Sequence, residues 1–221
     1  MSESSILILL GSALSIGFIH TVIGPDHYVP FIVISRARSW SATRTIVVTI
    51  MCGVGHVLSS ILIGTIGIAA GSALGKLVAI ESVRGDIASY ALIFFGIIYG
   101  LWGIWRGRKG HGHKHLHGGR HLDASNARSI TFWTLFIIFV LGPCEPLIPL
   151  LMFPAVSHSW YALTLVASVF GITTILTMTG MVYAGVKGVT AIKTDFIEKY
   201  VHAIAGGIIA FSGMAIRIFG I

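Results

Sequence analysis

Residues 6–34 read ILILLGSALSIGFIHTVIGPDHYVPFIVI, and this stretch decides how the rest of the chain is interpreted. It is longer than the roughly 20 apolar residues that a membrane-spanning helix needs. Yet residues 20–27, HTVIGPDH, place two histidines, an aspartate and a Gly-Pro pair inside it. Each of these polar groups is unfavourable in hydrocarbon. Their position therefore predicts a membrane helix that is broken at a functional site.

The composition agrees with an integral membrane protein. Of the 221 residues, 55% are hydrophobic and only 10% are charged, whereas soluble domains average about 25% charged residues. Cys52 and Cys144 both lie in apolar segments, which argues against a secreted fold held by disulfides. No cleavable signal peptide is evident. The net charge of +7 comes from loops between apolar segments, so nucleic acid is not expected as a partner.

Six apolar segments are long enough to span a membrane. Their expected limits are 5–34, 45–74, 87–106, 129–156, 160–187 and 197–219. Twelve of the fifteen Lys and Arg residues lie in or beside the connections at 35–44, 107–128 and 187–199. Because basic loops stay in the cytoplasm, we expect a multi-pass protein of the cytoplasmic membrane with both termini outside.

Weak internal matches divide the chain into two halves. Gly24-Pro25 in GPDHYVP corresponds to Gly142-Pro143 in GPCEPLIP. The predicted fold is all-α, with six transmembrane helices in two inverted three-helix repeats and with the first and fourth helices broken. The repeats are expected at 1–106 and 129–221, and a histidine-rich cytoplasmic loop at 107–128 joins them.

Only two of the eight carboxylates are expected inside a segment. Asp26 and Glu145 each follow a Gly-Pro pair, whereas the others, Glu81 and Asp86 among them, are expected at the N-terminus, in loops or at helix ends. A centred aspartate costs about 2.5–3.5 kcal/mol to insert, so an intramembrane carboxylate is a functional candidate. No Lys or Arg is expected in the middle of a segment, which argues against an exporter of anions.

Several metal-ligating side chains accompany Asp26. Neutral imidazole and carboxylate suit divalent first-row metals. Cys144 aligns with Asp26 across the repeat and could add a thiolate ligand, and Glu145 could complete the shell or carry a coupling proton. A structural cap and an inert buried thiol are the alternatives. The candidate metal ligands are His20, Asp26, His27, His56, Glu145 and Cys144.

The connecting loop alternates histidine with small or basic residues. Such tracts bind metals by composition, without a defined cage. The loop is therefore predicted to buffer or sense metal through His111, His113, His115, His117 and His121.

Two family resemblances follow from these motifs. GFIHTVIGPDH followed by GVGH resembles the nickel/cobalt transporter superfamily, especially its urease-accessory-like and efflux branches. This resemblance implies a metal site formed by His20, Asp26, His27 and His56. GPCEPLIP resembles the proline-flanked cysteine motif of the cytochrome c biogenesis thiol–disulfide transporters, which need a cysteine in each half. Cys144 matches one of these cysteines, and Asp26 stands at the partner position.

The sequence thus predicts a secondary transporter and not an enzyme. Its expected cargo is a divalent transition-metal ion, Ni²⁺ or Co²⁺ first, with Zn²⁺ or Fe²⁺ as further candidates, and no cofactor is permanently bound. Membrane lipid surrounds it, and a cytoplasmic metallochaperone or another soluble protein is a further expected partner. The alternative is a thiol–disulfide electron carrier of the cytochrome c biogenesis type that uses Cys144.

Overall fold

The structure is a computed structural model that describes residues 2–71, 74–108, 121–190 and 195–219; for 121–130, 190, 195 and 196 it describes the backbone only. These ranges are helical apart from short connections, and they contain no strand. The elements are α1 (Glu3–Ile23), the 3₁₀ helix η1 (Pro25–His27), α2 (Val29–Ala37), α3 (Ala42–Ala69), α4 (Leu74–Arg108), α5 (His121–Leu141), α6 (Leu147–Val156), α7 (Trp160–Thr190) and α8 (Asp195–Phe219).

The first and fourth apolar segments are broken at their Gly-Pro pairs, as predicted. α1 ends before Gly24, and the chain passes through η1 into α2. α5 ends before Gly142, and α6 begins only at Leu147. Proline lacks an amide donor and disfavours helix in the residue before it, so both breaks are local consequences of the sequence.

Five helices in the described part of the chain are long and apolar enough to cross a membrane: α1, α3, α4, α7 and α8. Large apolar side chains such as Leu7, Phe94 and Phe211 are at least 60% exposed, as lipid-facing residues would be. The chain is therefore an all-α, multi-pass membrane protein. The apolar part of α5 and the whole of α6 are shorter. The predicted count of six spans and the inverted repeat both depend on these two helices crossing together, and both stay predictions.

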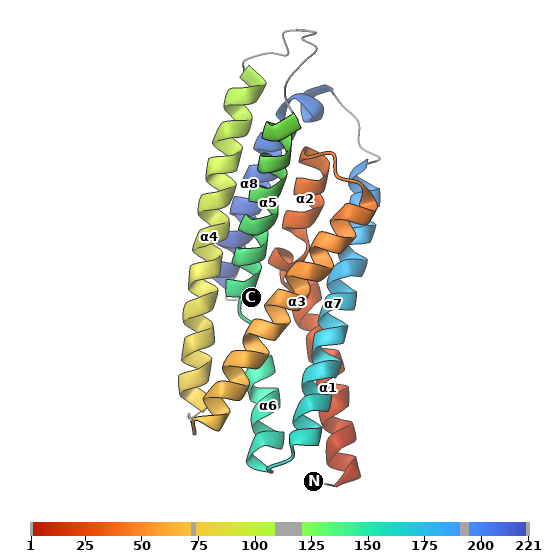
Figure 1. Cartoon of the computed structure of the whole chain (residues 1–221), viewed down its shortest axis with the longest axis vertical. Helices are drawn as coiled ribbons and strands as arrows, with labels where there is room; N and C mark the ends of the chain where they lie inside the picture. Colours follow the sequence, from red (N-terminus) through yellow and green to blue (C-terminus); the bar gives the residue numbers. More distant parts are fainter. Residues whose placement is uncertain (1, 72–73, 109–120, 191–194, 220–221) are drawn as a thin grey trace.

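The helices form an elongated bundle in which α3 crosses obliquely between α4 and α7 (Figure 1). α1 packs against α7, α3 against both α5 and α7, and α4 against α8. Where α4 and α8 pack together, their backbones are in direct contact. A Cβ atom on Gly96 would lie 2.4 Å from the amide nitrogen of Ala210, and one on Gly206 would lie 2.3 Å from that of Gly100. Small residues thus let these two helices approach closely.

Three expectations about the third segment are wrong. α4 begins at Leu74 and not near residue 87, so Glu81 and Arg84 lie within a helix and not in a loop. Glu81 is fully buried, and Arg84 is 9% exposed. The prediction that no Lys or Arg lies in the middle of a segment therefore also fails, because Arg84 lies inside α4. The two charges form an ion pair, and pairing is what makes such burial tolerable.

Candidate metal centre

The first break brings His20 and His27 together. The amide of Gly24 donates to the carbonyl of His20 at 3.0 Å where α1 ends, and the amide of His27 donates to the carbonyl of Gly24 at 3.2 Å. A Cβ atom on Gly24 would lie 2.6 Å from Nδ1 of His27, so a larger residue would displace the imidazole. The Tyr28 hydroxyl donates to the carbonyl of Val22 at 3.2 Å and satisfies an acceptor at the end of α1.

Three imidazoles converge from this break and from α3. The ring centroids of His20 and His27 are 4.8 Å apart, and those of His27 and His56 are 5.0 Å apart, with the rings nearly perpendicular in both pairs. One ring nitrogen from each histidine lies within 4.8 Å of the other two. A tetrahedral ion with bonds of about 2.0–2.1 Å to imidazole sets neighbouring nitrogens about 3.4 Å apart, so the rings must approach by about 1 Å on binding.

Hydrogen bonds fix the tautomers of two of these rings. Nδ1 of His56 lies 3.2 Å from the carbonyl oxygen of Phe139. Because a carbonyl can only accept, Nδ1 carries the proton and Nε2 keeps its lone pair. Nδ1 of His27 lies 3.0 Å from Oδ1 of Asp26, and an ionised carboxylate imposes the same tautomer. Metal-binding histidines are typically oriented in this way, by a carbonyl or carboxylate on the second ring nitrogen.

Two of the imidazoles have a buried nitrogen with nothing to bind. Nε2 of His20 and Nε2 of His27 have no hydrogen-bond partner among the described residues. Buried polar atoms nearly always have a partner, so two orphan nitrogens side by side indicate a ligand such as an ion or a water. On His27, where Nδ1 carries the proton, Nε2 is also the lone-pair donor that a metal would need.

Cys144 places a thiol beside one of the three histidines, His56, but neither Cys144 nor Asp26 belongs to the group of mutually close ligand atoms that the three histidines form. The Sγ atom of Cys144 lies 3.0 Å from Nε2 of His56, the nitrogen that the Phe139 carbonyl leaves unprotonated, so the thiol donates to the imidazole. Cys144 is fully buried. The other cysteine, Cys52, is also free and buried, in the core cluster that contains Phe31. Cys52 therefore packs among apolar side chains.

Glu145 is separate from the imidazole cluster. Its side chain is exposed and does not belong to the group of ligand atoms that the three histidines form. It borders a cavity of about 360 Å³ that His20, Asp26 and His27 also line. Asp86 lies on the same cavity and pairs with Arg217 at 3.3 Å. The structure thus places Glu145 beside the site but not among the nearest donors.

The second break is held by side chains that the sequence analysis did not select. Arg84 donates to the carbonyls of Val140, at 2.7 Å, and Gly142, at 3.2 Å. The amide of Cys144 donates to Oε2 of Glu81 at 3.1 Å. The only sequence signal for this arrangement is the spacing of Glu81 and Arg84, which places opposite charges on one face of a helix.

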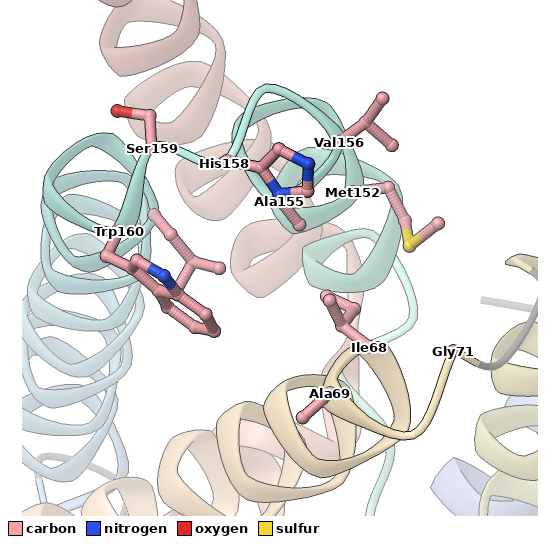
Figure 2. Close-up of a pocket in the computed structure, with 10 residues that line it drawn as sticks. Ile68, Ala69, Gly71, Met152, Ala155, Val156, His158, Ser159 and Trp160 are labelled. Atoms are coloured by element: carbon pink, nitrogen blue, oxygen red, sulfur yellow. The ribbon is translucent and has the colours of Figure 1, made fainter.

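The remaining predicted and incidental histidines lie elsewhere. His111, His113, His115 and His117 are outside the described residues, and for His121 only the backbone at the start of α5 is described. His202, in α8, hydrogen-bonds to the hydroxyl of Tyr99, in α4, at 2.8 Å. His158 borders a second cavity of about 300 Å³ between the ends of α3 and α6 and the start of α7 (Figure 2). That cavity is mainly apolar and touches none of the predicted metal ligands.

The fold and the site define a multi-pass, all-α membrane protein with a buried cluster of imidazoles and a thiol between two broken helices. Residues 30–215 match the family described as the cytochrome C biogenesis protein transmembrane region, and the chain belongs to this family. Neither the curated proteins nor the solved structures give a match. The matched region contains His56 and Cys144 but begins after the first break, so it does not include His20 and His27.

Proposed function

We propose that this protein binds a divalent transition-metal ion at His20, His27 and His56 and moves it across the membrane. The observation that carries the proposal is the convergence of three histidines, each of which has a ring nitrogen within 4.8 Å of the other two. Two of them, His20 and His27, have a buried Nε2 with no hydrogen-bond partner among the described residues. A metal ion would satisfy all three imidazoles at once. The Cys144 thiol, which lies 3.0 Å from Nε2 of His56 but outside the group of three histidine ligand atoms, would have to move toward the ion to supply a fourth donor.

The donor types narrow the choice of cargo. Imidazole and thiolate suit borderline ions such as Ni²⁺, Co²⁺, Zn²⁺ and Fe²⁺ better than Mg²⁺ or Ca²⁺, which prefer oxygen. The resemblance of the first motif to nickel/cobalt transporters puts Ni²⁺ and Co²⁺ first. Asp26 orients His27 and offsets part of the positive charge of the ion.

Transport would use the two broken helices. A site between discontinuous helices of inverted repeats is typical of secondary transporters, in which the halves rock around the ion. In this proposal α5 and α6 cross together as a sixth span, the termini lie outside the cytoplasmic membrane, and the histidine-rich loop gathers metal inside. A metallochaperone would deliver to that loop or collect from it.

The family match favours a second function, a thiol–disulfide electron carrier that uses Cys144. In such a carrier the Cys144 thiolate attacks a disulfide of another protein, which forms a mixed disulfide and releases one thiolate of that protein, and a thiolate of a further protein then attacks the mixed disulfide and releases Cys144. This function predicts that Cys144→Ser abolishes activity, that Cys52→Ser preserves it, and that metal is dispensable.

A calorimetric titration of the full chain with Ni²⁺ and Co²⁺ separates the two functions. All five loop histidines are first replaced by glutamine, so that only the membrane site remains. We expect one ion per chain, no binding after His20→Ala/His27→Ala, and unchanged binding after His158→Gln. Metal flux into proteoliposomes should likewise be lost in His20→Ala/His27→Ala and unchanged in His158→Gln. Binding that disappears with the loop histidines alone would refute the metal site and favour the thiol carrier.

A further inference from the structure

The Glu81–Arg84 ion pair is a buried feature that neither proposed function uses directly. Both residues lie in α4 and form an i,i+3 pair, with Glu81 fully buried. A buried ion pair adds little net stability by itself, because desolvation offsets the attraction between the charges. The contacts of the pair therefore indicate its role better than its charge does.

Arg84 holds the end of α5. Its guanidinium donates to the carbonyls of Val140 and Gly142, which lie where the helix stops. The last carbonyls of a helix have no amide partner within it. The planar guanidinium carries five donors in a fixed geometry, and Arg84 uses it for the two carbonyls, the Glu81 carboxylate and the hydroxyls of Ser59 and Ser60. A lysine ammonium has three donors and cannot serve all five acceptors.

Glu81 holds the next residues of the break. Its Oε2 accepts from the amide of Cys144 at 3.1 Å and from the hydroxyl of Ser60 at 3.1 Å. The Ser60 oxygen in turn lies 3.1 Å from the same amide. The backbone of Cys144 is therefore tied to α4 and α3 together, and its thiol lies 3.0 Å from His56.

The first break is held differently. There the Tyr28 hydroxyl, from the same segment, binds the carbonyl of Val22, and Asp26 binds the neighbouring His27. Among the residues that the structure describes, only the second break is held by an ion pair from another helix, α4. This asymmetry makes the position of the thiol depend on α4, whereas the position of His27 depends on its own segment.

We propose that Glu81 and Arg84 are positioning residues that hold the second break so that the Cys144 thiol faces His56. They thereby decide whether the thiol completes the metal shell. Only this last step rests on the proposed metal function, because the position of the thiol does not require a metal.

Thiol reactivity tests the proposal directly. In a Cys52→Ala background, Cys144 is the single cysteine, and its alkylation by N-ethylmaleimide can be followed in the folded protein. Glu81→Gln/Arg84→Gln removes both charges and leaves neither one buried alone. We expect alkylation to become about tenfold faster or more, the factor that corresponds to losing one or two hydrogen bonds to charged groups.

Two further variants test whether faster alkylation comes from lost positioning of the Cys144 thiol, from the loss of charge at Arg84, or from a general loosening of the fold. Arg84→Lys keeps the charge opposite Glu81 but has too few donors to keep all five contacts of the guanidinium, so its alkylation should also be faster. Asp86→Asn/Arg217→Gln removes an exposed ion pair between α4 and α8 and should leave the rate within about twofold of the parent. Size-exclusion profiles and melting temperatures establish that each variant is folded.

Co²⁺ spectra then report the last step. A thiolate ligand gives a sulfur-to-cobalt charge-transfer band, which imidazole ligands alone do not give. Glu81→Gln/Arg84→Gln should lose this band and keep the weaker ligand-field bands. Alkylation at the parent rate in a folded double variant, or in folded Arg84→Lys if the double variant does not fold, would overturn the positioning role. Faster alkylation with no Co²⁺ bound by any variant would uphold the positioning role and refute the metal function.

Discussion

Asp26→Asn removes one charge from the proposed metal centre and changes almost nothing else. The amide has the shape of the carboxylate, and its Oδ1 can still accept the Nδ1 proton of His27, now 3.0 Å from the carboxylate. What is lost is the negative charge that makes the opposite nitrogen of His27 a better donor and that offsets the charge of the ion. We therefore expect an intact fold with weakened metal binding.

The size of the effect follows from the position of Asp26 behind a ligand. Loss of an outer-shell partner of a metal-binding histidine lowers metal affinity by about 10- to 100-fold. This range corresponds to about 1.4–2.7 kcal/mol of binding free energy. The measurement is a calorimetric Ni²⁺ or Co²⁺ titration of the chain with silenced loop histidines, together with proteoliposome flux, which should be abolished.

Asp86→Asn is the matched control. Asp86 borders the same cavity but pairs with Arg217 and touches none of the three imidazoles. The same chemical change there should leave metal affinity within about twofold, because a half-exposed ion pair contributes little. Equal losses from both variants would mean that only the net charge of the cavity matters. Unchanged metal affinity and transport in Asp26→Asn would refute the role given to His27.

Three further substitutions test the geometry around the site. Gly142→Ala places a Cβ atom 3.2 Å from Nδ1 of His56 and should weaken Co²⁺ binding in a titration, whereas Gly11→Ala, with open space around it, should not. Gly96→Ala forces a Cβ atom against the backbone of α8 and should lower stability by about 1–3 kcal/mol or more in a thermal melt, with Gly207→Ala as the neutral control. Tyr28→Phe should cost about 1 kcal/mol in the same melt, because a carbonyl of α1 loses its donor.

The sequence was informative where structure depends on local chemistry. The two Gly-Pro pairs predicted both helix breaks, because proline constrains its own backbone wherever it occurs. The convergence of His20, His27 and His56 was also predictable, since intramembrane polar residues gather where they can find partners. The family match supports the resemblance to the thiol–disulfide transporters and does not extend to the nickel/cobalt transporters.

Pairing between distant residues was not predictable. Hydropathy adds contributions residue by residue. The four charged residues between 74 and 86, which include Glu81 and Arg84, lowered the apolar signal, so the third segment was expected to begin near residue 87 and not at Leu74. Only the tertiary structure reveals that the charges of Glu81 and Arg84 neutralise each other beside the second break. The same limit applies to Glu145. The predicted repeat aligns Glu145 with His27. Residues in a helix break do not follow the helical period, however, so the direction of the Glu145 side chain cannot be deduced from its spacing.

The single thiol at the second break links the family to the metal centre. A reversible intrachain disulfide needs two cysteines whose Cα atoms lie within about 7 Å. The chain has only two cysteines; Cys52 lies in the core cluster, and the predicted repeat places Asp26 opposite Cys144. A mixed disulfide with another protein would use the thiol but leave the orphan nitrogens of His20 and His27 without a partner. A bound metal ion accounts for the imidazoles and the thiol together, so metal should protect Cys144 from oxidation. Oxidation of Cys144 at the same rate with and without saturating Co²⁺ would contradict this argument.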